Sequence, residues 1–115
     1  MSKLAPLAGI RVLDVSSVLS GPLASMLLAD LGADVIKVEP PAAPDFTRGT
    51  GDAHNAMTAY FYNTNRGKRA IAVDGRRPAG QRILQALADQ ADVVVQNMRP
   101  GKAAGIGLDP DECLL

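Results

Sequence analysis

Residues 10–39, IRVLDVSSVLSGPLASMLLADLGADVIKVE, predict a strand, a turn, a helix and a second strand. The apolar run at 10–15 is typical of a short buried strand. Pro22 suits the first position of a helix, because the N–H that proline lacks would have no partner there. Gly32 is placed to end that helix, and 34–39 follow as the second strand. Two strands joined through a helix are most simply parallel with a right-handed crossover, so both should end at one edge of a sheet.

The second half of the chain predicts the same arrangement again. The stretch RAIAVD (69–74) alternates as a strand, and Pro78 begins a helix. DVVVQN (92–97) is a fourth strand, too continuously apolar for an edge strand with one exposed face. Asp109 is expected to cap one more helix. The predicted apolar stripe of the Pro78 helix, at spacings of three and four, consists of Ile83, Leu84, Leu87, Ala88 and Ala91.

The composition limits the size of the core and the kinds of partner. The chain has 115 residues, 47% of them apolar, so we expect one modest core and a single domain over 1–115. Twelve basic and twelve acidic residues cancel, which argues against nucleic acid and an anionic membrane as partners. The sequence has neither a long uncharged apolar stretch nor a signal-peptide pattern, so the expected location is cytoplasmic. Cys113 has no second cysteine to pair with, and we expect no metal site.

The connection between 39 and 59 is the irregular part of the chain. It is rich in proline and glycine and far longer than the usual connection of about four to six residues. Loops of this kind are lids, binding loops or contacts to another chain, and a merely mobile surface loop is equally compatible with the composition. His54 lies here with no partner acid at a recognisable spacing, so we expect a surface histidine.

The carboxyl ends of the predicted strands indicate where a ligand should bind. In a parallel sheet covered by helices, ligands bind beyond these ends. The ends supply a helix N-terminus at 16–22, the amide of Asn97, and three arginines, Arg76, Arg77 and Arg99. Guanidinium groups and helix N–H groups suit a phosphorylated, nucleotide-like ligand, although each arginine taken alone is better explained as a solvated loop charge. The chain contains neither a Gly-x-Gly-x-x-Gly turn nor a Walker lysine motif, so a standard dinucleotide site or P-loop is not supported.

Four blocks of sequence stand in a recognisable order. They are LAGIRVLD (7–14) with SGP (20–22), LGADVIKVE (31–39), NRGKR (65–69), and NMRPG (97–101) followed by GIGL (105–108). In content and spacing these blocks resemble the class III CoA-transferases, also called the CaiB/BaiF family. The resemblance covers nearly the whole chain. It implies a Rossmann-like α/β fold, a parallel sheet with flanking helices, forming a truncated N-terminal part of a longer protein whose two subunits interlock as a homodimer.

The resemblance also implies which residues contact coenzyme A. The matching positions are Leu19, Ser20, Val73, Asp74, Gly75, Arg76, Asn97, Met98 and Arg99. All of them lie at the edge of the sheet where a ligand is expected. Three positions depart from the family pattern: Leu19 stands where formyl-CoA transferases carry a glutamine, and Pro40 and Gly105 stand where some members carry an arginine. The formate and oxalate specialists are therefore expected to be poor guides to this chain.

The function implied by the resemblance is CoA binding within an enzyme that moves CoA between an acyl-CoA and a carboxylic acid. The family's transferases use an aspartate that attacks the thioester, and its α-methylacyl-CoA racemases use a histidine and an acid. By resemblance both sets lie beyond Leu115, so the chain alone is expected to be inactive. The alternatives are a racemase-like portion, a non-catalytic CoA-binding or assembly module, and an unrelated Rossmann-like oxidoreductase domain. We also expect self-association through an exposed apolar flank.

Overall fold

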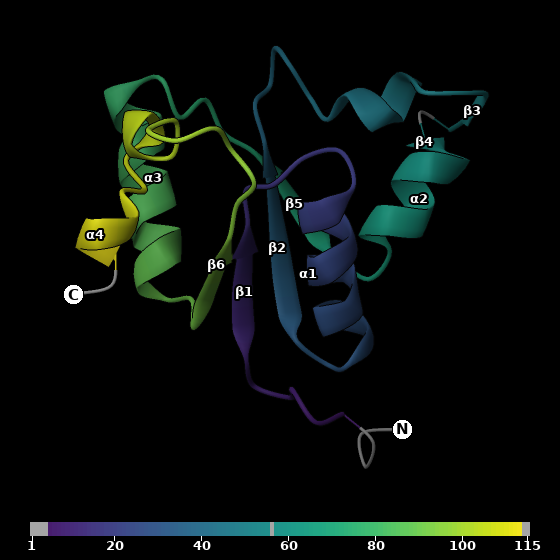
Figure 1. Ribbon diagram of the computed structural model, residues 1–115, viewed down its shortest axis with the longest axis horizontal. Helices are drawn as coiled ribbons and strands as arrows, with labels where there is room; N and C mark the ends of the chain where they lie inside the picture. The colour runs from purple at the N-terminus through teal and green to yellow at the C-terminus, as the bar shows by residue number, and fades with distance from the viewer. Residues whose placement is uncertain (1–4, 56, 114–115) are drawn as a thin grey trace.

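Four parallel strands form the central sheet of the computed structural model, which describes residues 5–55 and 57–113 (Figure 1). The strands are β1 (Arg11–Asp14), β2 (Asp34–Glu39), β5 (Arg69–Ala72) and β6 (Val93–Val95). They lie in the order β5-β2-β1-β6, and each neighbouring pair is parallel. The predicted α/β architecture with a parallel sheet is therefore confirmed.

Helices cover both faces of the sheet (Figure 1). Alternate residues of each strand point to opposite faces, so Val12 and Val35 pack toward α1 while Leu13 and Val38 pack toward Leu84 of α3. The segment containing α2 lies beside α1, and the C-terminal segment lies beside α3 (Figure 1). The helices are α1 (Ser20–Asp30), α2 (Ala59–Asn65), α3 (Pro78–Asp89), the short 3-10 turn η3 (Ala104–Ile106) and α4 (Pro110–Cys113).

The local signals of the first strand-helix-strand unit are mostly confirmed. The second strand has the predicted bounds, and Gly32 ends α1 with a left-handed φ of +103°. The predicted start of α1 is wrong by two residues, because the helix begins at Ser20 and Pro22 sits third in it. Proline is tolerated there because the first four N–H groups of a helix lack intrahelical partners. At the other end of the chain, Asp109 caps α4 by accepting the N–H of Asp111 at 3.0 Å.

Two predictions about burial in the second unit are wrong. The strand β6 lies at the edge of the sheet formed by the described residues, and its Val93 is 41% exposed. A continuous apolar run therefore does not guarantee an interior strand. Ile83 is 47% exposed, because α3 turns Leu84 toward the sheet, with Leu87, Ala88 and Ala91 beside it, and leaves Ile83 on its flank.

The long connection after β2 is folded into short regular elements. It contains a 3-10 turn, η2 (Phe46–Gly49), and two short antiparallel strands, β3 (Ala53–His54) and β4 (Met57–Thr58). The helix α2 follows directly and was not predicted from the sequence. Thr58 caps it, since the Thr58 side chain accepts the N–H of Phe61 at 3.1 Å. His54 is exposed, as expected for a surface histidine.

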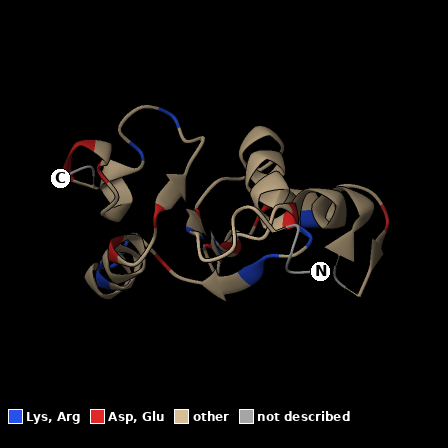
Figure 2. Cartoon of the chain, turned by 90° about the horizontal axis from the view of Figure 1, so that it is seen from below, with Lys and Arg blue, Asp and Glu red and all other residues tan. Residues whose placement is uncertain are grey.

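Charged residues of both signs are spread over most elements (Figure 2). Several of the charged side chains near the surface form ion pairs, for example Arg66 with Asp30 at 2.8 Å and Arg69 with Asp34 at 2.7 Å. Such exposed pairs add little to stability, because solvent screens their attraction. Within residues 5–55 and 57–113, none of the helices combines the length and the apolar character that a membrane span requires.

Candidate functional site

The carboxyl ends of all four main-sheet strands lie at one edge, because the strands are parallel. Along the chain, β2 is added beside β1 and β5 is added beside β2. The next strand, β6, pairs with the other side of β1. Open α/β sheets bind ligands at the point where the strand order reverses in this way. That point lies between the loop after β1, which carries Leu19 and Ser20, and the loop after β6, which carries Asn97 and Arg99.

The two loops at this point are joined by the side chain of Asn97. Its Oδ1 accepts the N–H of Ser17 at 3.0 Å, and its Nδ2 donates to the carbonyl of Ser17 at 2.7 Å. The loops also approach closely at Gly21, where an added Cβ would lie 3.3 Å from Cγ of Asn97. One donor and one acceptor position of the Asn97 amide therefore serve the neighbouring backbone, and contact between Asn97 and a ligand stays a prediction.

The first turn of α1 presents backbone N–H groups at the same place. The helix has no side-chain cap, since Leu19 occupies the N-cap position. Within the described residues, the N–H groups of Ser20 and Gly21 have no acceptor. Unpaired N–H groups at the positive end of a helix attract anions and polarised carbonyl oxygens. Leu19 itself is 49% exposed and offers an apolar surface beside these donors.

The third predicted stretch, at 73–76, makes several contacts within the protein. Val73 is 6% exposed and packs against Leu84 in the core, so its side chain is not available to a ligand. Asp74 accepts the backbone N–H and the Nε of Arg76, both at 3.1 Å. These contacts with Arg76 lower the pKa of the Asp74 carboxyl. The guanidinium of Arg76 nevertheless remains exposed and can exchange this partner for a ligand.

The remaining predicted residues lie around the same edge. Gly75 is buried, and an added Cβ would lie 2.9 Å from Ile106, so the turn after β5 packs against η3. Met98 is half-buried against the core. Arg99 is exposed, and no carboxylate of the described residues lies within ion-pair distance of it.

A buried group of ion pairs lies behind the loop after β1, on the side of the sheet that faces α1 and α2. Lys68 Nζ lies 2.8 Å from Asp14, and Lys37 Nζ lies 3.1 Å from Asp45, with all four side chains at most 2% exposed. We did not predict these pairs. The register places Asp14 opposite Lys37 in neighbouring strands, and charged residues inside apolar strands are the signal that could have indicated them.

Asp14 and Lys68 join distant parts of the chain. Lys68 precedes β5 and begins at the opposite end of the sheet, as expected, but its long side chain reaches Asp14 at the end of β1. Lys68 Nζ also donates to the carbonyl of Pro22 at 3.0 Å. Asp14 further accepts hydrogen bonds from the hydroxyls of Ser16 and Ser25. The pair therefore fixes both the loop after β1 and the first turn of α1.

Hydrogen bonds keep the buried carboxylates ionised. Burial raises the pKa of Asp14, but hydrogen bonds from Lys68, Ser16 and Ser25 outweigh this effect and hold it below the ordinary value of 3.8. Burial also opposes ionisation of Glu39, yet Arg48 and the backbone N–H of Asp45 lower its pKa below 4.5. For Asp45, contacts with Thr47 and Lys37 likewise outweigh burial and lower the pKa.

These lowered pKa values predict that acid destabilises the fold. At acid pH, the carboxylates of Asp14, Glu39 and Asp45 bind protons more readily in the unfolded chain than in the folded chain. The stability from Asp14, Glu39 and Asp45 is therefore complete above the unfolded values near 3.8 and 4.5, and is lost as pH falls through the lower folded values. Thermal midpoints measured from neutral pH down to about pH 3 should fall steeply below about pH 4.5. The variant Asp52→Asn, which removes an exposed carboxylate, should give the same profile; a midpoint that is flat over this range would contradict the prediction.

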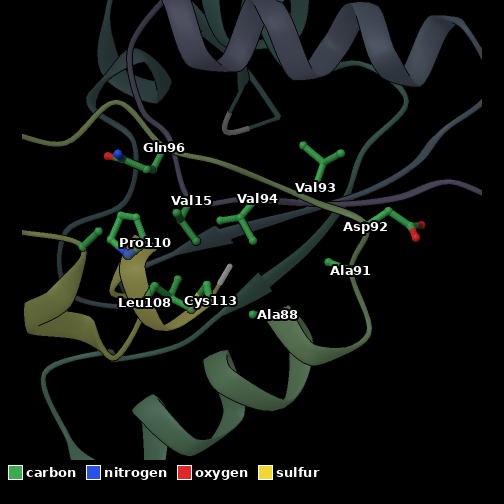
Figure 3. A pocket seen from close by; sticks show the side chains of 11 residues that line it. Val15, Ala88, Ala91, Asp92, Val93, Val94, Gln96, Leu108, Pro110 and Cys113 are labelled. Carbon is green, nitrogen blue, oxygen red and sulfur yellow. The ribbon is translucent and has the colours of Figure 1, made fainter. Parts of the chain in front are cut away.

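An apolar pocket of about 270 Å³ lies away from this edge, between β6, α3 and α4 (Figure 3). Side chains of Val15, Val94 and Leu108 enclose it, while Asp92 and Gln96 extend away from this aliphatic group (Figure 3). A catalytic pocket needs converging polar groups, which this lining does not supply. Among the described residues, no cluster of three or more His, Cys, Asp or Glu side chains could hold a metal ion.

The comparisons with known proteins agree on one family. The model of CoA-transferase family III matches residues 7–114. The chain is 50% identical over 104 residues to a succinyl-CoA:glutarate CoA-transferase of Mus musculus, covering 90% of this chain and 24% of that protein. It is 48% identical over 96 residues to a formyl-CoA:oxalate CoA-transferase of Afipia carboxidovorans, covering 83% and 23%. Overall identity is thus nearly the same to both kinds of transferase, and the expectation about the formyl-CoA:oxalate enzymes stays a prediction based on Leu19, Pro40 and Gly105.

A solved structure shows the same fold. A CaiB/BaiF family protein of Brucella suis superposes with a TM-score of 0.87 at 39% identity, covering 95% of this chain and 30% of that one. The chain thus spans about a quarter of the length of the curated relatives it matches.

Proposed function

Because the chain belongs to CoA-transferase family III, we propose that it is the CoA-binding portion of an enzyme that moves CoA between an acyl-CoA and a carboxylic acid. One observation carries this proposal. The uncapped N-terminus of α1 lies at the reversal of strand order, beside the loop after β6 that Asn97 joins to it. Helix N–H groups at this place suit an anionic or polarised ligand.

The residues at the edge divide into two roles. The N–H groups of Ser20 and Gly21 would donate to carbonyl or phosphate oxygens of the bound acyl-CoA, with Leu19 against its apolar part. Arg76 and Arg99 would pair with its phosphates, which guanidinium groups recognise with two parallel hydrogen bonds. Because these residues come from several loops along the chain, we treat residues 1–115 as one CoA-binding domain. No step of this binding calls for a metal.

We infer that the catalytic residues lie outside residues 7–114, the part of the chain that the family model matches. Transfer through this family's chemistry needs a nucleophilic carboxylate, and nucleophiles must be accessible. Asp14 is 0% exposed and is held by three side chains, so it does not meet this requirement. The relatives named above are CoA-transferases, which supports transfer over racemisation. We therefore expect no transferase activity from the 115-residue chain alone.

A cytoplasmic homodimer completes the proposal. Self-association is supported by the outer face of α1, where exposed leucines recur every fourth residue. They are Leu23 and Leu27 in the helix and Leu31 directly after it. A contiguous apolar ridge of this kind is typical of a contact surface between chains. The single cysteine fits a reducing compartment.

Replacing Arg76 by alanine should lower the affinity of the chain for CoA, because an exposed guanidinium at the binding edge is lost. Arg69→Ala is the matched control. Arg69 is also exposed and paired with an aspartate, Asp34, but it lies at the amino ends of the strands. Calorimetric titration with CoA at fixed salt should show weaker binding for Arg76→Ala and unchanged binding for Arg69→Ala. Equal affinities of the two variants would remove Arg76 from the site.

A further inference from the structure

The loop between β1 and α1 contains a strained residue. Val18 has a φ of +74°, in the left-handed region that β-branched residues strongly avoid. Such a conformation persists only where the surroundings impose it, and it is concentrated at functional sites. Val18 directly precedes Leu19 and Ser20, so its backbone angle sets the direction in which the first N–H groups of α1 point.

The contact that holds Val18 comes from the long connection after β2. The Val18 N–H donates to the Asp45 carboxylate, 3.2 Å from Oδ2 and 3.4 Å from Oδ1. Asp45 is itself held by Lys37 Nζ at 3.1 Å and by the N–H and hydroxyl of Thr47 at 3.1 and 2.8 Å. Lys37 Nζ also donates to the Ser16 carbonyl at 3.3 Å. The Lys37–Asp45 pair therefore hydrogen-bonds to the loop at two points, the Ser16 carbonyl and the Val18 N–H, one on each side of Ser17.

The opposite side of the loop is held by Asn97, which bonds both backbone groups of Ser17. Asp14 accepts the N–H of Ser16 at 2.9 Å. The backbone is thus fixed residue by residue from Ser16 to Val18, and among the described residues its N–H groups have no acceptor from Leu19, the residue before α1, to Gly21. An ion pair this buried adds little net stability, because desolvation offsets its attraction, so its value lies in the geometry it imposes.

We propose that Asp45, supported by Lys37, is a positioning residue that holds Val18 in its left-handed conformation and so aims the N–H groups of Ser20 and Gly21 at the acyl-CoA. The identity of the ligand in this inference rests on the function proposed above, whereas the contact by which Asp45 holds Val18 does not. The connection after β2 thereby acquires a definite role: it carries Asp45 to the back of the binding loop.

The test uses the 115-residue chain and two matched variants. Asp45→Ala removes the acceptor of the Val18 N–H. Thr47→Val has nearly the same shape as the original and removes a different hydrogen bond to Asp45, leaving the contact with Val18 in place. Three measurements are compared: thermal midpoints, isotope-labelled backbone amide shifts of Ser17 to Gly21, and calorimetric affinity for CoA.

We expect Asp45→Ala to move these amide shifts and to weaken CoA binding about tenfold, the effect of misplacing one well-formed hydrogen bond. Thr47→Val should lower the thermal midpoint while the loop amide shifts and the affinity stay close to those of the original chain. Amide shifts and affinity that stay unchanged in Asp45→Ala would overturn the positioning role.

A second pair of variants keeps the inference testable if Asp45→Ala does not fold. At ordinary backbone angles alanine stabilises a protein more than glycine, but at a φ of +74° the order reverses. Val18→Gly should therefore melt above Val18→Ala, and the opposite order would overturn the inference. If the original chain does not bind CoA, the proposed function fails, while the hold on Val18 is still judged by the amide shifts and this order of melting.

Discussion

Replacing Lys68 by methionine is expected to lower the free energy of unfolding by about 3 to 5 kcal/mol. The substitution keeps most of the side-chain volume but leaves the Asp14 carboxylate, 0% exposed, without its counter-charge. A domain of this size is stable by about 5 to 15 kcal/mol, so the variant should be unfolded or close to it at physiological temperature. Denaturant titration followed by circular dichroism measures the change.

Two further variants separate charge from packing. Arg66→Ala breaks the exposed ion pair with Asp30 and should cost less than about 1 kcal/mol. The double variant Lys68→Met/Asp14→Asn leaves neither member of this pair charged and should recover part of the loss, because the amide oxygen can still accept from Ser16 and the amide nitrogen can donate to the hydroxyl of Ser25. If Lys68→Met costs no more than Arg66→Ala, the buried pair does not hold the loop after β1 to the sheet.

The second large effect is expected at Gly80, in the first turn of α3. A Cβ at this position would lie 1.9 Å from the carbonyl oxygen of Asp74, so Gly80→Ala forces the backbone apart. We expect a net loss of about 1 to 3 kcal/mol, since the clash outweighs the better helix propensity of alanine. The displaced turn carries Arg76, so affinity for CoA should fall together with stability.

Gly105→Ala is the control for this substitution. Nothing lies within 4 Å of a Cβ built at Gly105, and its backbone is not left-handed. Chemical denaturation should show little change for Gly105→Ala and a clear loss for Gly80→Ala. Equal stability of the two variants would mean that α3 does not pack against the turn after β5 as closely as the structure has it.

Much of the fold follows from local patterns in the sequence. The strand at 34–39 has the predicted limits, and α3 begins at Pro78 as predicted, although it ends at Asp89, before Ala91 of the predicted stripe. The helix α2 escaped prediction because it has only 7 residues, and its stability comes from the Thr58 cap and from burial of Phe61. The edge position of β6 could not be predicted either, since strand order depends on pairings between distant residues.

The sequence predicted which loops form the candidate site better than it predicted the contacts of their side chains. The carboxyl ends of parallel strands must meet at one edge, so the loops containing Ser20, Arg76 and Asn97 followed from topology. Their individual contacts did not follow. Asn97 serves the backbone of Ser17, and the hold on Val18 comes from Asp45, whose position depends on the folding of an irregular connection. Side-chain roles of this kind require three-dimensional contacts between distant segments.

The most direct measurement of CoA binding at this edge is an amide-shift map of the isotope-labelled chain titrated with CoA. We expect saturable shifts concentrated in three loops, at residues 17–21, 74–77 and 97–101, with little change at the amino ends of the strands around Arg11, Asp34 and Arg69. Shifts concentrated at those amino ends, or in the apolar pocket beside β6, would contradict the proposed site. The complete absence of shifts at saturating CoA would contradict CoA binding by this chain.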